Sequence, residues 1–79
     1  MSKNNASAGA AENLRHRILT GSLVAGSMLP GERELSESLG VSRLTLRNAL
    51  ATLQAEGLVE KVHGAGNRVL PYRDSGGVE

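Results

Sequence analysis

The chain has 79 residues, which suits one small domain, and nine basic against eight acidic side chains give it a net charge of only +1. It contains no cysteine, which excludes disulfides and thiolate metal sites, and Tyr72 is its single aromatic residue. The core must therefore be aliphatic, and no apolar run is long enough for a signal peptide or a membrane span.

The first twenty residues predict a tail and a short helix. Residues 1–10 carry no large apolar side chain after the initiator, so we expect them to form a disordered tail. Residues 11–20 follow with Leu14 and Ile18 at helical spacing, which predicts a short amphipathic helix.

Glycine and proline then mark residues 23–30 as a loop that ends in a brief extended piece, with Met28 and Leu29 anchoring it to the core. The Pro-Gly pair that follows can open a second helix over residues 32–39. Gly31 would be its N-cap, which is usable but less favourable than serine.

A tight turn leads into the third predicted helix, residues 43–56. Gly40 can end the second helix in a left-handed conformation, and Ser42 can cap the third. The apolar side chains follow an i, i+3, i+4, i+7 spacing: Leu46, Ala49, Leu50 and Leu53. Leu44, Arg47, Asn48 and Ala51 point the other way, and Arg43 and Thr45 lie on the flanks near the N-terminal end. The two helices predict a helix-turn-helix whose second helix can enter a DNA major groove about 12 Å wide.

After Gly57 the hydrophobic period changes from helical to extended. Two β-prone runs within residues 58–70, joined by Gly64-Ala65-Gly66, predict a hairpin, and Pro71 ends it. Residues 72–79 are expected to be a tail or linker. The predicted fold is mainly α with a small β-hairpin: a winged helix-turn-helix domain of three helices plus a wing, over residues 11–71.

Charge is distributed unevenly along this domain. Residues 32–37 carry three acids, whereas residues 43–55 and 61–70 carry basic side chains and no acid. Such asymmetry is expected where one surface meets phosphates, although ordinary solvated charge remains the alternative.

Residues 14–71 resemble the N-terminal winged-helix domain of the GntR family of bacterial transcription regulators. The resemblance is carried by six blocks in order: Ile18-Leu19-Thr20-Gly21, Gly26 to Leu35, Gly40-Val41-Ser42-Arg43, Leu46 to Leu50, Leu53 to Val59, and His63-Gly64-Ala65-Gly66. It implies sequence-specific binding of double-stranded DNA in transcription regulation, in the bacterial cytoplasm and on the nucleoid. The His-Gly pair is similar to that of the fatty-acid-responsive regulators, in which the hairpin tip enters the minor groove.

The resemblance and the residue pattern together give the predicted DNA-binding set: Arg33, Ser42, Arg43, Leu44, Thr45, Arg47, Asn48, Lys61, His63 and Gly64. Four positions depart from the family pattern. Gly31 replaces serine or alanine, Leu44 can touch a thymine methyl, Asn48 replaces a common glutamate, and Arg68 replaces an aromatic residue.

Family regulators continue into a C-terminal domain that binds a small-molecule effector and dimerises, whereas this sequence ends at Glu79. We therefore expect a DNA-binding domain cut at its linker or a short form, monomeric by itself, with a dimer of the full-length regulator on a palindromic operator. No cofactor, metal site or catalytic residue is expected, since no carboxylate pair, metal cluster or nucleophile with a base stands out. A winged-helix protein-interaction module is the alternative function, and RNA binding is weaker because stacking aromatics are missing.

Overall fold

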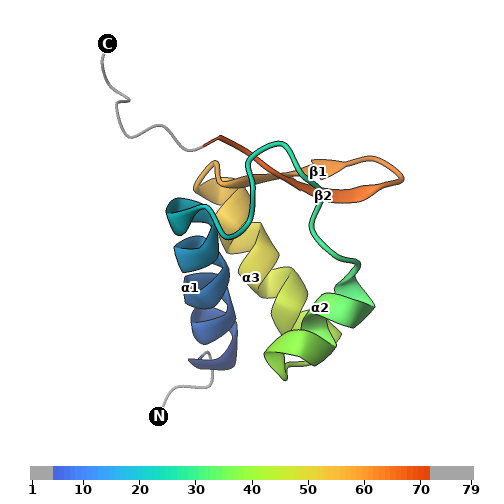
Figure 1. Ribbon diagram of the computed structural model, residues 1–79. Helices are drawn as coiled ribbons and strands as arrows, with labels where there is room; N and C mark the ends of the chain where they lie inside the picture. The colour runs from blue at the N-terminus through green and yellow to red at the C-terminus, as the bar shows by residue number, and fades with distance from the viewer. Residues whose placement is uncertain (1–4, 72–79) are drawn as a thin grey trace.

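The computed structural model describes residues 5–71. It contains three helices followed by a two-stranded antiparallel hairpin (Figure 1). The elements are α1 (Asn5–Thr20), α2 (Glu32–Leu39), α3 (Arg43–Ala55), β1 (Val59–Val62) and β2 (Gly66–Val69). This arrangement confirms the predicted winged helix-turn-helix fold.

The start of α1 corrects the predicted domain boundary. The helix begins at Asn5 and not at residue 11, so residues 5–10 are not a tail. Alanine has the highest helix propensity of all residues, and Ala10 and Ala11 are buried in the core. Their small side chains provide an apolar face that a search for large hydrophobic residues overlooks. The first four residues and the predicted linker 72–79 lie outside the described part of the chain.

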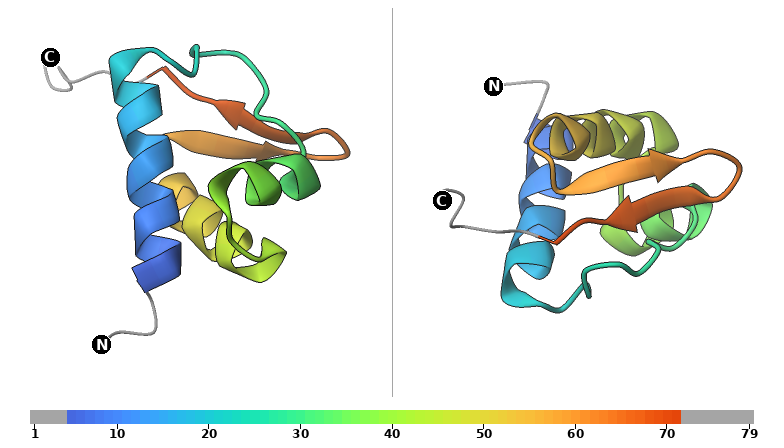
Figure 2. Two further views of the ribbon diagram at one scale, coloured as in Figure 1. Left: turned by 60° about the horizontal axis from the view of Figure 1, so that its bottom comes forward. Right: turned by 90° about the horizontal axis from the view of Figure 1, so that it is seen from above.

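The core lies between the helices and one face of the hairpin. Helices α1 and α3 lie side by side, α2 packs against α3, and the hairpin lies across one end of the helices (Figure 2). The largest fully buried side chains are Leu14, Leu46, Leu53, Val59 and Val69. The predicted apolar face of α3 is entirely buried, and burial of each such leucine stabilises the fold by about 1.5 to 3 kcal/mol.

The turn between α2 and α3 has the predicted caps. Gly40 takes a left-handed conformation with φ of 72°, and Val41 is half-buried against the core. The Ser42 hydroxyl accepts a hydrogen bond from the Thr45 amide at 3.0 Å. Helix α3 ends at Ala55, one residue earlier than predicted, and Glu56 is its C-cap.

The loop before α2 runs along the outer edge of β2. The Leu29 amide donates to the Asn67 carbonyl at 2.8 Å, and Met28 pairs with Arg68 in an isolated antiparallel bridge. Because neighbouring side chains of an extended segment point to opposite faces, only one of the two can enter the core. Leu29 is buried as predicted, but Met28 is exposed, and its methyl carbon lies over Gly66. The prediction that Met28 anchors the loop in the core is therefore wrong.

Candidate nucleic-acid interface

The outward face of α3 presents a group of exposed side chains opposite the core. Leu44 is 68% exposed and the Arg47 side chain is 62% exposed, and Arg43 and Asn48 are exposed as well. Thr45 is half-buried on the flank. The helical period that buries Leu46 thus turns these side chains toward solvent.

The first turn of α3 is fixed by Ser42 and Thr45. The Ser42 hydroxyl accepts from the Thr45 amide and donates to the Thr45 hydroxyl oxygen, both at 3.0 Å. This arrangement leaves the Thr45 hydroxyl proton available to a phosphate oxygen. Ser42 and Thr45, two residues of the predicted DNA-binding set, therefore also stabilise the first turn of α3, which carries Arg43 and Leu44.

Arg47 forms an ion pair with Glu32, which lies 15 residues earlier in the sequence. The Arg47 Nε donates to Glu32 Oε1 at 3.0 Å, from α3 to the first residue of α2. The charge pattern along the sequence separates the acidic segment from the basic face. In the structure, the first acid of that segment contacts this face. Because both side chains are partly exposed, such a pair stabilises the fold by about 0 to 1 kcal/mol. The sequence did not predict this contact of Glu32 with the candidate face.

The other cations of the domain differ in their pairing. Arg33 lies 4.0 Å from Glu37 one turn along α2, and Arg68 lies 3.3 Å from Glu60, its cross-strand partner. Arg43 forms no ion pair with any residue between 5 and 71, and the same holds for Lys61. These two cations can therefore meet phosphates without first leaving an acid.

The hairpin carries three residues of the predicted DNA-binding set, two in its turn and one in β1. His63 and Gly64 are exposed in the turn between the strands, where Gly64 has a φ of 77° that favours glycine. Lys61 lies nearer the helices, where it lines a hollow of about 130 Å³ together with Glu32 and Arg47. The fold thus brings Lys61 and Arg47 to one hollow, whereas His63 and Gly64 do not line it.

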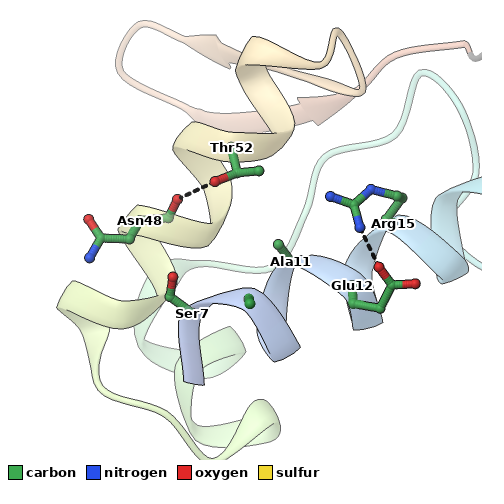
Figure 3. Close-up of a pocket in the computed structure, with 7 residues that line it drawn as sticks. Ser7, Ala11, Glu12, Arg15, Asn48 and Thr52 are labelled. Carbon is green, nitrogen blue, oxygen red and sulfur yellow. Dashed lines mark hydrogen bonds and ion pairs between the residues drawn. The ribbon is translucent and has the colours of Figure 1, made fainter. Parts of the chain in front are cut away.

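A second hollow, of about 480 Å³, lies between α1 and α3 (Figure 3). Asn48 and Thr52 line it from α3, and Ser7 lines it from α1. Sequence reasoning missed Ser7 because it assigned residues 1–10 to a tail. The alanine-rich composition of that stretch was the signal that could have placed it on a helix.

Arg15 lines this hollow from α1 and forms ion pairs with two acids. Its guanidinium donates two hydrogen bonds of 2.9 Å to the Glu56 carboxylate and also contacts Glu12. The hydrogen bonds from Arg15 lower the pKa of Glu56 below its ordinary value, and the same contact raises the pKa of Arg15. The network ties α1 to the C-cap of α3.

Residues 5–71 contain neither a metal-binding cluster nor a helix that could span a membrane. No group of three or more histidine or acidic side chains there could hold a metal ion. Within the same range, no helix combines the length and the apolar composition that crossing a bilayer requires.

Three helices, a wing and an exposed helix face beside it define a winged helix-turn-helix domain. Residues 6–69 match the family model described as bacterial regulatory proteins, gntR family. The chain belongs to the gntR family, which confirms the resemblance seen in the sequence.

The chain is similar to curated regulators and to solved DNA-binding domains. It is 42% identical over 59 residues to the HTH-type transcriptional regulator GgaR of Escherichia coli K12, covering 75% of this chain and 24% of that protein. It is 49% identical over 61 residues to the uncharacterized regulator YieP of the same strain, covering 77% and 26%. The chain therefore spans about a quarter of the length of these relatives.

Among solved structures, the N-terminal domain of AraR in complex with a mutant ORR3 matches with a TM-score of 0.76 at 33% identity, covering 87% of this chain and 96% of that one. The AraR DNA-binding domain in complex with operator ORX1 matches with a TM-score of 0.77, also at 33% identity, covering 87% and 81%.

Proposed function

We propose that this domain binds double-stranded DNA at specific sequences to regulate transcription, with α3 in the major groove and the hairpin at the minor groove or the backbone. The observation that carries the proposal is the exposed face of α3, where arginines and Leu44 stand beside a capped helix start. The solved complexes of the similar AraR domain with operator DNA support it.

The contacts of the predicted set divide by chemistry. Arg43 and Arg47 would donate to guanine O6 and N7, and Leu44 would touch a thymine methyl. The side chains of Thr45 and Asn48, together with backbone amides at the helix starts, would fix the register on phosphates. Ser42 would act through the helix start that it caps. Arg33 and Lys61 would add affinity that is independent of sequence, and His63 with Gly64 would enter the minor groove.

The regulator to which such a domain belongs would be a dimer on a palindromic operator, because a two-fold axis repeats the α3 contact on two half-sites. A small-molecule effector would act through a further domain of that regulator. The domain alone would bind one half-site weakly.

Fluorescence anisotropy with random-sequence duplexes at several salt concentrations tests the DNA reading. If Arg33 and Lys61 each neutralise one phosphate while Arg43 and Arg47 bind bases, the log-log salt slope is about −1.8, at about 0.9 per phosphate contact. Arg43→Ala should weaken binding at every salt concentration. Arg17→Ala is the charge-matched control, since Arg17 lies in the last turn of α1, outside the helix-turn-helix.

Binding that is indifferent to salt, or no binding to any duplex at low salt, would contradict the proposal. The exposed Leu44 on α3 would then favour a winged-helix domain that docks onto another protein.

A further inference from the structure

We propose that Glu32 is a positioning residue for base recognition: it holds the Nε side of Arg47 and leaves both terminal nitrogens of the guanidinium free to read a base. This inference rests on the proposed DNA binding, and Glu32 lies outside the residue set predicted from the sequence.

The hydrogen-bond geometry carries the argument. Within residues 5–71, Arg47 makes one side-chain hydrogen bond, from Nε to Glu32 Oε1 at 3.0 Å. A guanidinium has five N–H donors in a rigid planar fork, so fixing Nε also fixes the plane of the group. The two terminal nitrogens remain available, and a fork of two N–H groups matches the O6 and N7 acceptors of guanine.

Glu32 is well placed to act as the fixed partner. It is the first residue of α2, where an acid is stabilised by the positive end of the helix dipole, and its side chain is only 31% exposed. Helix α2 is anchored by the buried Leu35 and joined to α3 through the capped turn. The distance between Glu32 and Arg47 is therefore set by the helix-turn-helix itself.

Besides positioning Arg47, the negative charge of Glu32 should weaken the binding of DNA. Glu32 lines the same hollow as Lys61, beside the face proposed to meet DNA, so its charge repels phosphates. Removing the charge should strengthen binding to DNA of any sequence. If Glu32 positions Arg47, its removal should at the same time weaken the discrimination between bases, because a free arginine side chain samples many rotamers.

Glu34 provides a matched control on the same helix. It is also an acid in the first turn of α2, it is exposed, and it forms no ion pair with any residue between 5 and 71. Glu34→Gln therefore removes the same charge at nearly the same place and leaves Arg47 held. Any effect that Glu32→Gln shows beyond that of Glu34→Gln belongs to the contact with Arg47.

The first experiment uses the native domain without DNA and measures hydrogen exchange of the arginine Nε–H groups by NMR. We expect the Arg47 Nε–H to exchange several-fold more slowly than that of Arg43, which has no acidic partner in residues 5–71, and to lose this protection in Glu32→Gln. Equal exchange at Arg43 and Arg47 in the native domain would overturn the proposal before any DNA is added.

The second experiment selects bound sequences from a random duplex pool with the native domain, Arg47→Ala, Glu32→Gln and Glu34→Gln. The position whose base preference disappears in Arg47→Ala is the one that Arg47 reads. We expect both glutamine variants to bind random DNA about two- to threefold more tightly. Only Glu32→Gln should lower the preference at that position, by about three- to tenfold.

The outcomes separate the two proposals. If the native domain shows no salt-dependent DNA binding, the proposed function fails, and the inference fails with it. If the native domain selects a motif and Glu32→Gln retains it as Glu34→Gln does, DNA binding stands and the positioning role is overturned, because Glu32 is then only a counter-ion.

Discussion

The Ser42 side chain links the stability of the domain to its proposed binding face. Its hydroxyl satisfies the Thr45 amide, one of the first backbone donors of α3 that have no partner within the helix. Ser42→Ala removes this bond and should lower the free energy of unfolding by about 1 kcal/mol, within a range of about 0.5 to 2. For a domain of this size, a loss of about 1 kcal/mol corresponds to a fall in Tm of about 4 to 8 °C.

Thermal unfolding followed by circular dichroism measures this change. Ser38→Ala is the control, because Ser38 is exposed within α2 and its side chain forms no hydrogen bond with the rest of residues 5–71. That substitution should leave Tm unchanged or raise it slightly, since alanine has the higher helix propensity. Equal Tm values for Ser42→Ala and Ser38→Ala would refute the capping argument.

Ser42→Asp separates the cap from the DNA contact. An aspartate caps as well as serine and is favoured at a helix N-terminus, so the fold should keep its stability. Its negative charge beside Arg43 should nevertheless weaken DNA binding in the anisotropy assay.

Two further predictions concern the ion pair of Glu56 and the turn before α3. Arg15 lowers the folded-state pKa of Glu56, so the pair stabilises the fold above the ordinary glutamate pKa, and this contribution disappears as pH falls through the lowered folded value. The stability difference between the native domain and Glu56→Gln, measured by urea unfolding, should therefore shrink as pH falls below about 4.5, the ordinary glutamate pKa, and should not grow. Gly40→Ala should lower the free energy of unfolding by about 1 to 2 kcal/mol, because φ is 72° and the added Cβ meets no atom within 4 Å, so that backbone strain alone acts. Gly9→Ala, inside α1 with equal space around it, should stabilise the domain by about 0.5 to 1 kcal/mol in the same assay, and a loss there would contradict this account.

Local signals in the sequence sufficed for most of the fold. The bounds of α2, the left-handed Gly40, the Ser42 cap and the buried face of α3 all follow from residue types at short spacing, because caps and helical periodicity involve residues within one or two turns. The hairpin was predicted for the same reason, although β2 already begins at Gly66, which the sequence placed in the turn. The sequence also predicted correctly which side chains of α3 face solvent. Their contacts with DNA remain proposals.

Contacts between distant segments were decided only by the tertiary structure. Ala10 and Ala11 are buried in a helix that packs against α3, and no local pattern of large apolar side chains marks that packing. Met28 points outward because the loop before α2 pairs with β2, which fixes the side of each residue. Glu32 meets Arg47 because the turn at Gly40 folds α2 back onto α3. The charge pattern along the chain separates those two side chains, whereas the fold joins them, because electrostatic interaction depends on distance in space and not on distance along the sequence.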